Sequence, residues 1–243
     1  MKKEWKVSLF AFGLLVLFLI LQYDFSEDNT WKSWNLPLSG RVILVDPGHG
    51  GPDGGAGDSN ALEKDIALNV SLKLKEYLQE QGALVVMTRE EDIDLADEDT
   101  KGYSRRKVED LKKRLKMINK PEIDFFVSIH LNSIPSPRWS GAQTFFAPYY
   151  RENERAARFI QDEFKINLEN TKREAKSINH IYILENAKKP GVLVEVGFLS
   201  NPSERENLKK DRYQDKLAAS IYYGILRYYS NEKEIIIPEH RRP

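Results

Sequence analysis

The sequence predicts an α/β fold: a single domain with a mixed, mostly parallel, twisted sheet and helices on both faces, plus an N-terminal membrane-anchor helix. Short apolar runs typical of buried strands alternate with amphipathic, helix-like segments along residues 40–230. A separate apolar run follows a basic N-terminus. The composition, with 41% hydrophobic and 30% charged residues, is that of a folded globular protein.

The N-terminal apolar run extends from Val7 to Leu21. A helix of this length spans about 22 Å, which is short for a bilayer core of about 30 Å. No small-residue cleavage site follows Leu21, so we expect an anchor that is retained rather than a signal that is removed. The basic start favours a cytoplasmic N-terminus. The rest of the chain is therefore expected outside the cell, tethered to the membrane, or secreted if the segment is cleaved.

The sequence therefore predicts four parts: an anchor at residues 1–25, a polar linker at 26–39, the folded domain at 40–230 and a flexible tail at 231–243. The domain begins with an apolar run that a proline and a glycine-rich loop end, which predicts a buried strand over residues 41–46. Apolar residues then recur at helical spacing from residue 62 to a stop at Gly82, and residues 83–87 predict a second strand.

Residues 90–99 contain seven acidic residues and predict a solvated loop. The helix expected next has an apolar stripe of Val108, Leu111, Leu115 and Ile118. We expect its basic residues to lie on a solvated face that pairs with the acidic loop; they are Lys112, Lys113, Arg114 and Lys116. The remaining predicted strands are 124–129, 142–147, 181–184 and 192–196, and the remaining helices are 153–170 and 213–229.

Charge and composition exclude several classes of partner. Lys and Arg total 37 and Asp and Glu total 37, so there is no basic excess of the kind that nucleic-acid binding requires. Cysteine is absent, which excludes disulfides and thiolate metal sites.

The glycine-rich loop at residues 48–57 lacks the spacing of nucleotide-binding loops, so we expect no nucleotide. Its glycines are better explained by backbone that approaches closely around His49.

Two of the four histidines directly follow strand-like runs: His49 follows the first strand, and His130 ends another. Glu63 lies in the first turn of the helix after the glycine-rich loop. If the two strands are neighbours, all three side chains meet at one edge of the sheet. A single histidine after a strand is usually an ordinary loop residue. Two histidines and a carboxylate, however, are a common catalytic zinc set, and the three together predict a Zn²⁺ site.

Glu195 interrupts the apolar run 192–198 near its carboxyl end. A buried carboxylate is costly unless it is paired or ligated. An apolar wall raises the pKa of a carboxyl group and suits it to general base catalysis. The alternative is a structural glutamate that pairs with a lysine or arginine.

Other polar residues have weaker signals. Asn119, Asn132 and Arg114 are candidates for orienting the site or the substrate, or for fixing loops. We expect His180 to start a strand rather than to bind metal, and His240 to be solvated in the tail.

The motifs resemble those of the zinc-dependent N-acetylmuramoyl-L-alanine amidases of the Amidase_3 family, which cut peptidoglycan. They occur in family order over residues 40–229, and they are Asp46–Gly51, Asp53–Ala56, Glu63–Asp65, Thr88–Arg89, Leu111-x-x-Arg114, Asn119, Ser128–Asn132 and Val194–Asn201. The resemblance implies that His49, Glu63 and His130 hold zinc and that Glu195 is the catalytic acid/base. It also implies hydrolysis of the amide between the lactyl group of N-acetylmuramic acid and the L-alanine of the stem peptide.

Three further segments are similar to the sporulation amidases of this family: the short anchor, Trp31-x-x-Trp34 and Gly102–Arg106. This implies a role in spore-cortex maturation, in which stem peptides are removed before muramic lactam forms. The stretch Leu95–Asp110 is longer than the usual family link. Separate wall-binding repeats are absent, so the expected partners are the glycan strand with its stem peptide, the membrane and, as an open question, an activator protein. A catalytically inactive peptidoglycan-binding module and a zinc peptidase acting within the stem peptide are the alternatives.

Overall fold

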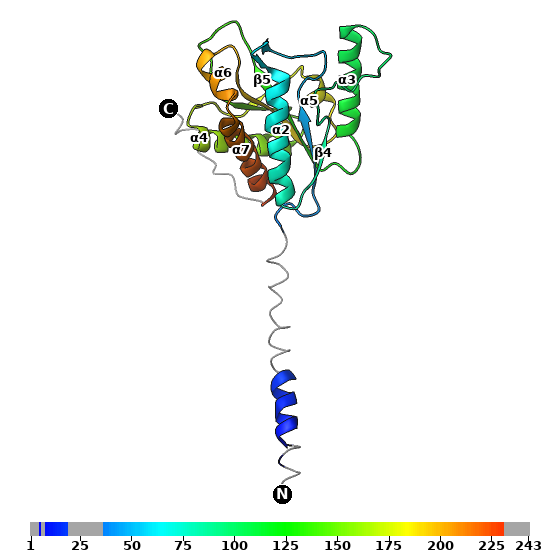
Figure 1. Cartoon of the computed structure of the whole chain (residues 1–243), viewed down its shortest axis with the longest axis vertical. Coiled ribbons are helices and arrows are strands. Elements are labelled where there is room, and N and C mark those ends of the chain that lie inside the picture. The colour runs from blue at the N-terminus through cyan, green and yellow to red at the C-terminus, as the bar shows by residue number, and fades with distance from the viewer. Residues whose placement is uncertain (1–4, 6–7, 19–35, 231–243) are drawn as a thin grey trace. The chain divides into compact units, whose positions relative to one another are not determined.

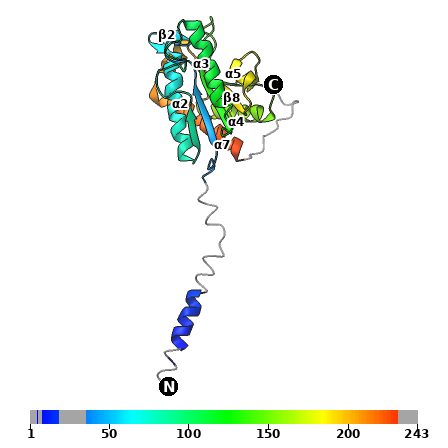
Figure 2. The same cartoon turned by 90° about the vertical axis from the view of Figure 1, so that its right-hand side faces the viewer.

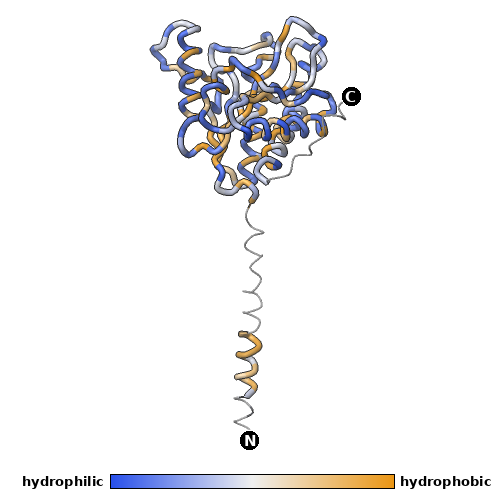
Figure 3. The backbone as a smooth tube through the Cα atoms, turned by 180° about the vertical axis from the view of Figure 1, so that it is seen from behind, coloured by the Kyte–Doolittle hydropathy of each residue, from blue (hydrophilic) through white to orange (hydrophobic). Residues whose placement is uncertain are grey.

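The computed structural model describes Trp5 and residues 8–18 and 36–230, and it contains two compact units, Met1–Leu36 and Pro37–Pro243 (Figure 1). In the first unit, residues 8–18 are helical and exposed, and they are mostly hydrophobic (Figure 3). Among the described residues, no helix has the length and apolar character needed to cross a membrane. The predicted anchor and linker lie partly outside the described residues, and the tail with His240 lies wholly outside them.

The second unit is built on a six-stranded sheet with the order β4-β1-β5-β8-β6-β7. The strands are β1 (Val42–Pro47), β4 (Leu84–Met87), β5 (Phe125–Asn132), β6 (Gln143–Phe146), β7 (Lys176–Ser177) and β8 (Gly191–Phe198). The neighbouring strands β4, β1, β5 and β8 are all parallel, whereas β6 is antiparallel to β8. The mixed, mostly parallel sheet is confirmed. A short hairpin of β2 (Gly57–Asp58) and β3 (Ala61–Leu62) precedes the first large helix.

Helices cover both faces of the sheet, as predicted (Figures 1 and 2). The helices are α2 (Glu63–Glu80), α3 (Tyr103–Ile118), α4 (Arg151–Leu168), α5 (Tyr182–Asn186), α6 (Pro202–Leu208) and α7 (Asp211–Tyr229). The larger hydrophobic core lies between the sheet and α2, α4 and α7, and the smaller one between the sheet and α3 and α5.

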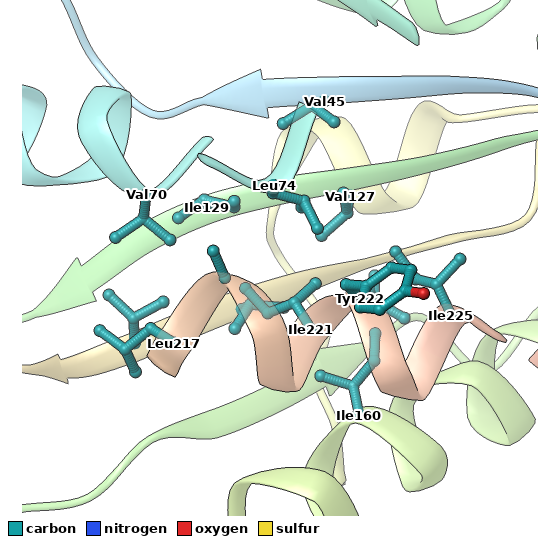
Figure 4. Close-up of a cluster of buried hydrophobic side chains, with 14 of the residues drawn as sticks. Val45, Val70, Leu74, Val127, Ile129, Ile160, Leu217, Ile221, Tyr222 and Ile225 are labelled. Carbon is teal, nitrogen blue, oxygen red and sulfur yellow. The ribbon is translucent and has the colours of Figure 1, made fainter. Parts of the chain in front are cut away.

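Apolar residues at helical spacing build the larger core. On α7 these are Leu217, Ile221 and Ile225, which are fully buried and lie beside side chains of β5, α2 and α4 (Figure 4). Each side chain of this size contributes about 1.5–3 kcal/mol when it is fully buried. A Cβ atom at Gly224 would lie 2.5 Å from the Cα atom of Ile160, so this glycine lets α7 approach α4 closely.

The structure corrects two element-level predictions. Most of the predicted strand 181–184 is instead part of the helix α5, and His180 is not in a strand but in irregular backbone before this helix, with a φ of 67°. A four-residue apolar run does not distinguish strand from helix, and the burial of Ile183 and Leu184 in the smaller core decides it. In α3 the predicted apolar stripe is wrong at Val108, which is 53% exposed.

The buried face of α3 is formed instead by Asp110, Arg114 and Ile118. Arg114 was expected on the solvated face, but only 1% of it is exposed. The predicted pairing of this helix with the acidic loop is confirmed by ion pairs of Arg106 with Asp94 and of Lys113 with Asp97.

Candidate active site

Three side chains predicted to bind metal meet at the carboxyl edge of the sheet. Strands β1 and β5 are neighbours and parallel, so His49 just after β1 and His130 near the end of β5 lie at the same edge. Glu63 is the first residue of α2. His49 Nε2 lies 3.1 Å and His130 Nδ1 3.0 Å from Glu63 Oε1. Among the described residues, this is the one group of three such side chains whose ligand atoms converge, all within 4.8 Å of one another.

Glycines allow this close packing. A Cβ atom at Gly48 would collide with the His130 ring, and one at Gly55 would lie 2.6 Å from Glu63 Oε2 and 2.7 Å from the His49 ring. His49 itself has a φ of 61°, a left-handed conformation that is uncommon for a residue with a side chain. The predicted role of the glycine-rich loop, close backbone approach around His49, agrees with this geometry.

The carboxylate of Glu63 is held by backbone as well as by the histidines. Its Oε1 accepts a hydrogen bond from the Leu131 amide at 3.0 Å, and its Oε2 accepts one from the Ala56 amide at 2.8 Å. Burial alone would raise the pKa of Glu63, but hydrogen bonds with His130 and His49 outweigh it and hold the pKa well below its usual range. The group is therefore an anion, the form in which it can bind a cation.

The second nitrogen of His49 also has a partner. Its Nδ1 lies 2.9 Å from Asp53 Oδ2, and Asp53 in turn contacts two residues of α3, accepting a hydrogen bond from Tyr103 Oη at 2.8 Å and pairing with Lys107 Nζ at 3.0 Å. A carboxylate on the far nitrogen of a metal-binding histidine fixes the tautomer and orientation of the ring. The contact between His49 and Asp53 was not predicted from the sequence, although an aspartate four positions after His49 is a signal for it.

Arg114 fixes the loop that carries His49. Its guanidinium group forms an ion pair with Asp46 at 2.7 Å and donates hydrogen bonds to the carbonyl oxygens of Pro47 and His49, each at 2.6 Å. Asp46 is fully buried. Burial would raise the pKa of Asp46, but Arg114 and two hydroxyl donors outweigh it and lower the pKa.

Arg89, two residues after the end of β4, supports the same loop. It is buried and donates to the carbonyl oxygens of Gly48 at 2.8 Å and Pro47 at 3.2 Å. Thr88 and Ser128 donate their hydroxyl protons to the two oxygens of Asp46, each at 2.7 Å. These motif residues therefore hold the backbone of the site.

Glu195 lies on β8, directly opposite His130 on β5. Its Oε2 is buried and has no hydrogen-bond partner in the described part of the chain. Burial raises the pKa of Glu195 to about 7, against the opposing effect of His130. No lysine or arginine among the described residues forms an ion pair with it, so the alternative of a structural pair finds no support there. A carboxyl group that titrates near neutrality beside a cluster of metal-binding type can accept and donate a proton.

The remaining candidates lie in different places. Asn132 ends β5, two residues past His130, and its carbonyl oxygen accepts a hydrogen bond from the Leu199 amide at 2.9 Å. The side chain of Asn119 instead fixes the loop after α5, with hydrogen bonds to the Lys188 amide at 2.7 Å and the Asn186 carbonyl at 3.2 Å. It does not contact the histidine cluster. The His180 side chain is 95% exposed.

Comparison with known proteins gives consistent matches. Residues 43–227 match the Amidase_3 family, described as N-acetylmuramoyl-L-alanine amidase. The chain is 57% identical over 232 residues to the germination-specific N-acetylmuramoyl-L-alanine amidase of Bacillus subtilis (strain 168), covering 96% of this chain and 98% of that protein. The fold is similar to the CwlD amidase from Clostridioides difficile, solved in complex with the GerS lipoprotein, with a TM-score of 0.76 and 39% identity over 79% of this chain and 100% of that chain. It also resembles an N-acetylmuramoyl-L-alanine amidase from Clostridium difficile 630, with a TM-score of 0.69 and 29% identity over 79% of this chain and 98% of that chain.

Proposed function

The chain belongs to the Amidase_3 family of N-acetylmuramoyl-L-alanine amidases, and from that premise we propose that it is a zinc-dependent hydrolase of peptidoglycan. The bond that it cuts is the amide between the lactyl carbonyl of N-acetylmuramic acid and the L-alanine of the stem peptide. The observation that carries this proposal is the buried Oε2 of Glu195, which has no hydrogen-bond partner among the described residues and lies on the strand beside His130 of the cluster His49, Glu63 and His130.

The residues fit zinc. His49 Nε2, Glu63 Oε1 and His130 Nδ1 would hold the ion, because two imidazoles and one carboxylate are a common catalytic zinc set. When bound, zinc supplies Lewis-acid polarisation of a carbonyl group and lowers the pKa of water.

Glu195 performs the proton transfers. Its carboxylate accepts a proton from the attacking water and delivers it to the nitrogen of the leaving alanine. A pKa of about 7 suits both steps, since the group is neither a strong acid nor a strong base at neutral pH. Asp53 holds His49 through the ring nitrogen Nδ1, and Arg114 holds it through the backbone carbonyl oxygen.

The test compares the purified full chain with Glu195→Gln and His49→Ala, using purified peptidoglycan, mass analysis of released peptides and metal content. Wild type should contain one zinc and release peptides that begin with L-alanine. Glu195→Gln should keep zinc and the fold but lose activity by at least about 10²-fold. His49→Ala should lose zinc. Intact activity in Glu195→Gln would refute the role assigned to this residue.

The reaction products also distinguish the amidase from a zinc peptidase and from an inactive binding module. A zinc peptidase would leave L-alanine attached to the glycan, whereas the amidase leaves a free lactyl carboxylate. An inactive binding module would bind peptidoglycan and release nothing.

We propose further that the chain acts on spore cortex outside the cytoplasmic membrane, held there by its N-terminal segment. The 57% identity to a germination-specific amidase supports the cortex role, and the basic, apolar N-terminus supports the tether. A lipoprotein partner is proposed because the similar CwlD amidase was solved with one. Fractionation of sporulating cells, with capture of bound proteins, tests location and partner together.

A further inference from the structure

His130, Glu195 and Gln143 form a row across three neighbouring strands of the sheet. His130 on β5 is opposite Glu195 on β8, and Glu195 is opposite Gln143 on β6. Paired residues on neighbouring strands present their side chains on the same face of the sheet, about 5 Å apart. The next residue of β6, Thr144, is fully buried on the opposite face. Gln143 therefore stands beside the proposed proton carrier.

Gln143 holds the guanidinium group of Arg173. Arg173 Nη1 donates to Gln143 Oε1 at 3.0 Å, and Nε donates to the Ser140 carbonyl oxygen at 3.2 Å. The guanidinium carbon lies 5.2 Å from the centroid of the Trp139 ring and 5.0 Å from that of Phe198. Arg173 is thus a partly buried cation with a set orientation rather than a freely moving surface side chain.

This cation forms no ion pair within the described residues, although the carboxylate of Glu204 lies close enough to interact with it electrostatically. Among the described residues no carboxylate forms an ion pair with Arg173, and none accepts a hydrogen bond from its Nη2. The nearby buried Glu204 is occupied by the backbone amides of Gly141 and Phe198, at 2.8 and 2.9 Å. Other arginines with a set orientation, such as Arg106 and Arg114, do have carboxylate partners within this protein. A planar guanidinium with free donors is suited to a carboxylate ligand.

We propose that Arg173 binds a carboxylate of the stem peptide and so makes the enzyme select stem peptides with a free carboxylate near the scissile amide. Trp139, which is 51% exposed, lies beside this anion site and offers an apolar surface to the peptide. Two extended residues span about 7 Å, which exceeds the separation of about 5 Å between paired residues such as Glu195 and Gln143. This inference rests on the proposed function and adds a specificity residue to it.

The experiment pairs a substrate change with a protein change. Two N-acetylmuramoyl dipeptides are compared, one with a free carboxylate on its second residue and one with a carboxamide there. Wild type should prefer the carboxylate in kcat/KM by roughly ten- to hundredfold, the value of a hydrogen bond to a charged group. Arg173→Ala should lose that preference by a fall on the carboxylate substrate alone. Lys172→Ala, which removes a charge from the neighbouring exposed residue, should keep it.

In the kinetic experiment, the inference would be overturned by equal cleavage of both substrates by wild type or by an equal fall in kcat/KM on both substrates in Arg173→Ala. If Arg173→Ala does not fold, Arg173→Lys replaces it, and the preference should shrink because the planar fork is lost. Calorimetric binding of the two released dipeptides is measured in parallel and needs no turnover. Carboxylate-selective binding that depends on Arg173, without any cleavage of peptidoglycan, would refute the proposed function and uphold this inference. Binding without selectivity would refute the inference alone.

Discussion

Two carboxylates of the site have pKa values that are shifted in opposite directions. His130 and His49 outweigh burial at Glu63 and lower its pKa, whereas burial dominates at Glu195 and raises its pKa to about 7. A carboxyl group with a lowered pKa stays ionised, whereas one with a pKa near 7 can accept and release a proton. The roles proposed for the two residues therefore depend on their surroundings, because both side chains carry the same carboxyl group.

The raised pKa of Glu195 predicts a pH-dependent change in stability. A carboxyl whose folded-state pKa lies above its ordinary value of 4.5 stabilises the fold fully below that value, and the contribution is lost as the pH rises through about 7. Glu195→Gln stays neutral at every pH. At about pH 8 the metal-free variant should therefore melt at a higher temperature than metal-free wild type, by about 2–4 °C for each kcal/mol of difference in the free energy of unfolding. At about pH 4.5 it should melt no higher than wild type.

Thermal unfolding with chelator present measures this shift. Glu76→Gln, at an exposed position of α2, is the matched control and should show no such pH dependence. Equal melting temperatures for Glu195→Gln and wild type at about pH 8 would contradict the shifted pKa.

Helix α3 is the element that supports the site. Tyr103 and Lys107 contact Asp53 behind His49, and Arg114 binds the loop backbone. Their spacing places them along one side of the helix. The stretch Leu95–Asp110, whose role the sequence left open, thus contributes two of these contacts.

Replacement of Arg114 should destabilise the protein strongly. Arg114→Met leaves the fully buried Asp46 without its cation, and breaking a buried pair in this way costs about 3–5 kcal/mol. Urea unfolding measures the loss. The exposed Lys112→Met on the same helix should change stability by less than about 0.5 kcal/mol. Adding Asp46→Asn to Arg114→Met should restore part of the loss; a further loss in the double variant would contradict the pairing.

At the scale of the whole molecule, the proposed zinc site joins three segments that are distant in the sequence. His49 follows β1, Glu63 starts α2 and His130 lies on β5. These side chains converge only when the sheet and α2 are assembled, so a metal bound there binds the folded state alone. Such binding adds its free energy to that of folding.

Zinc should therefore raise the melting temperature. At a free zinc concentration of about 100 times Kd, the free energy of unfolding should rise by about 2.7 kcal/mol. For a domain of this size that corresponds to a rise in melting temperature of roughly 5–10 °C. A titration of the chelator-treated chain, followed by calorimetry, tests this. His49→Ala should show no rise, and a rise equal to that of wild type would place the metal elsewhere.

The sequence by itself determined the order of most elements and singled out the four residues proposed for the site. Strand runs, helical spacing and glycine punctuation are local properties, and His49, His130 and Glu195 stand at the ends of strand-like runs where parallel strands must meet. Only the tertiary structure decided which other residues contact these four side chains and support them. The burial of Arg114, the helix at 182–186, the Asp53 contact and the row from His130 to Gln143 depend on which face of each element is covered and on strand register. Those are set by packing between segments distant in sequence, and one chain's local pattern does not contain them.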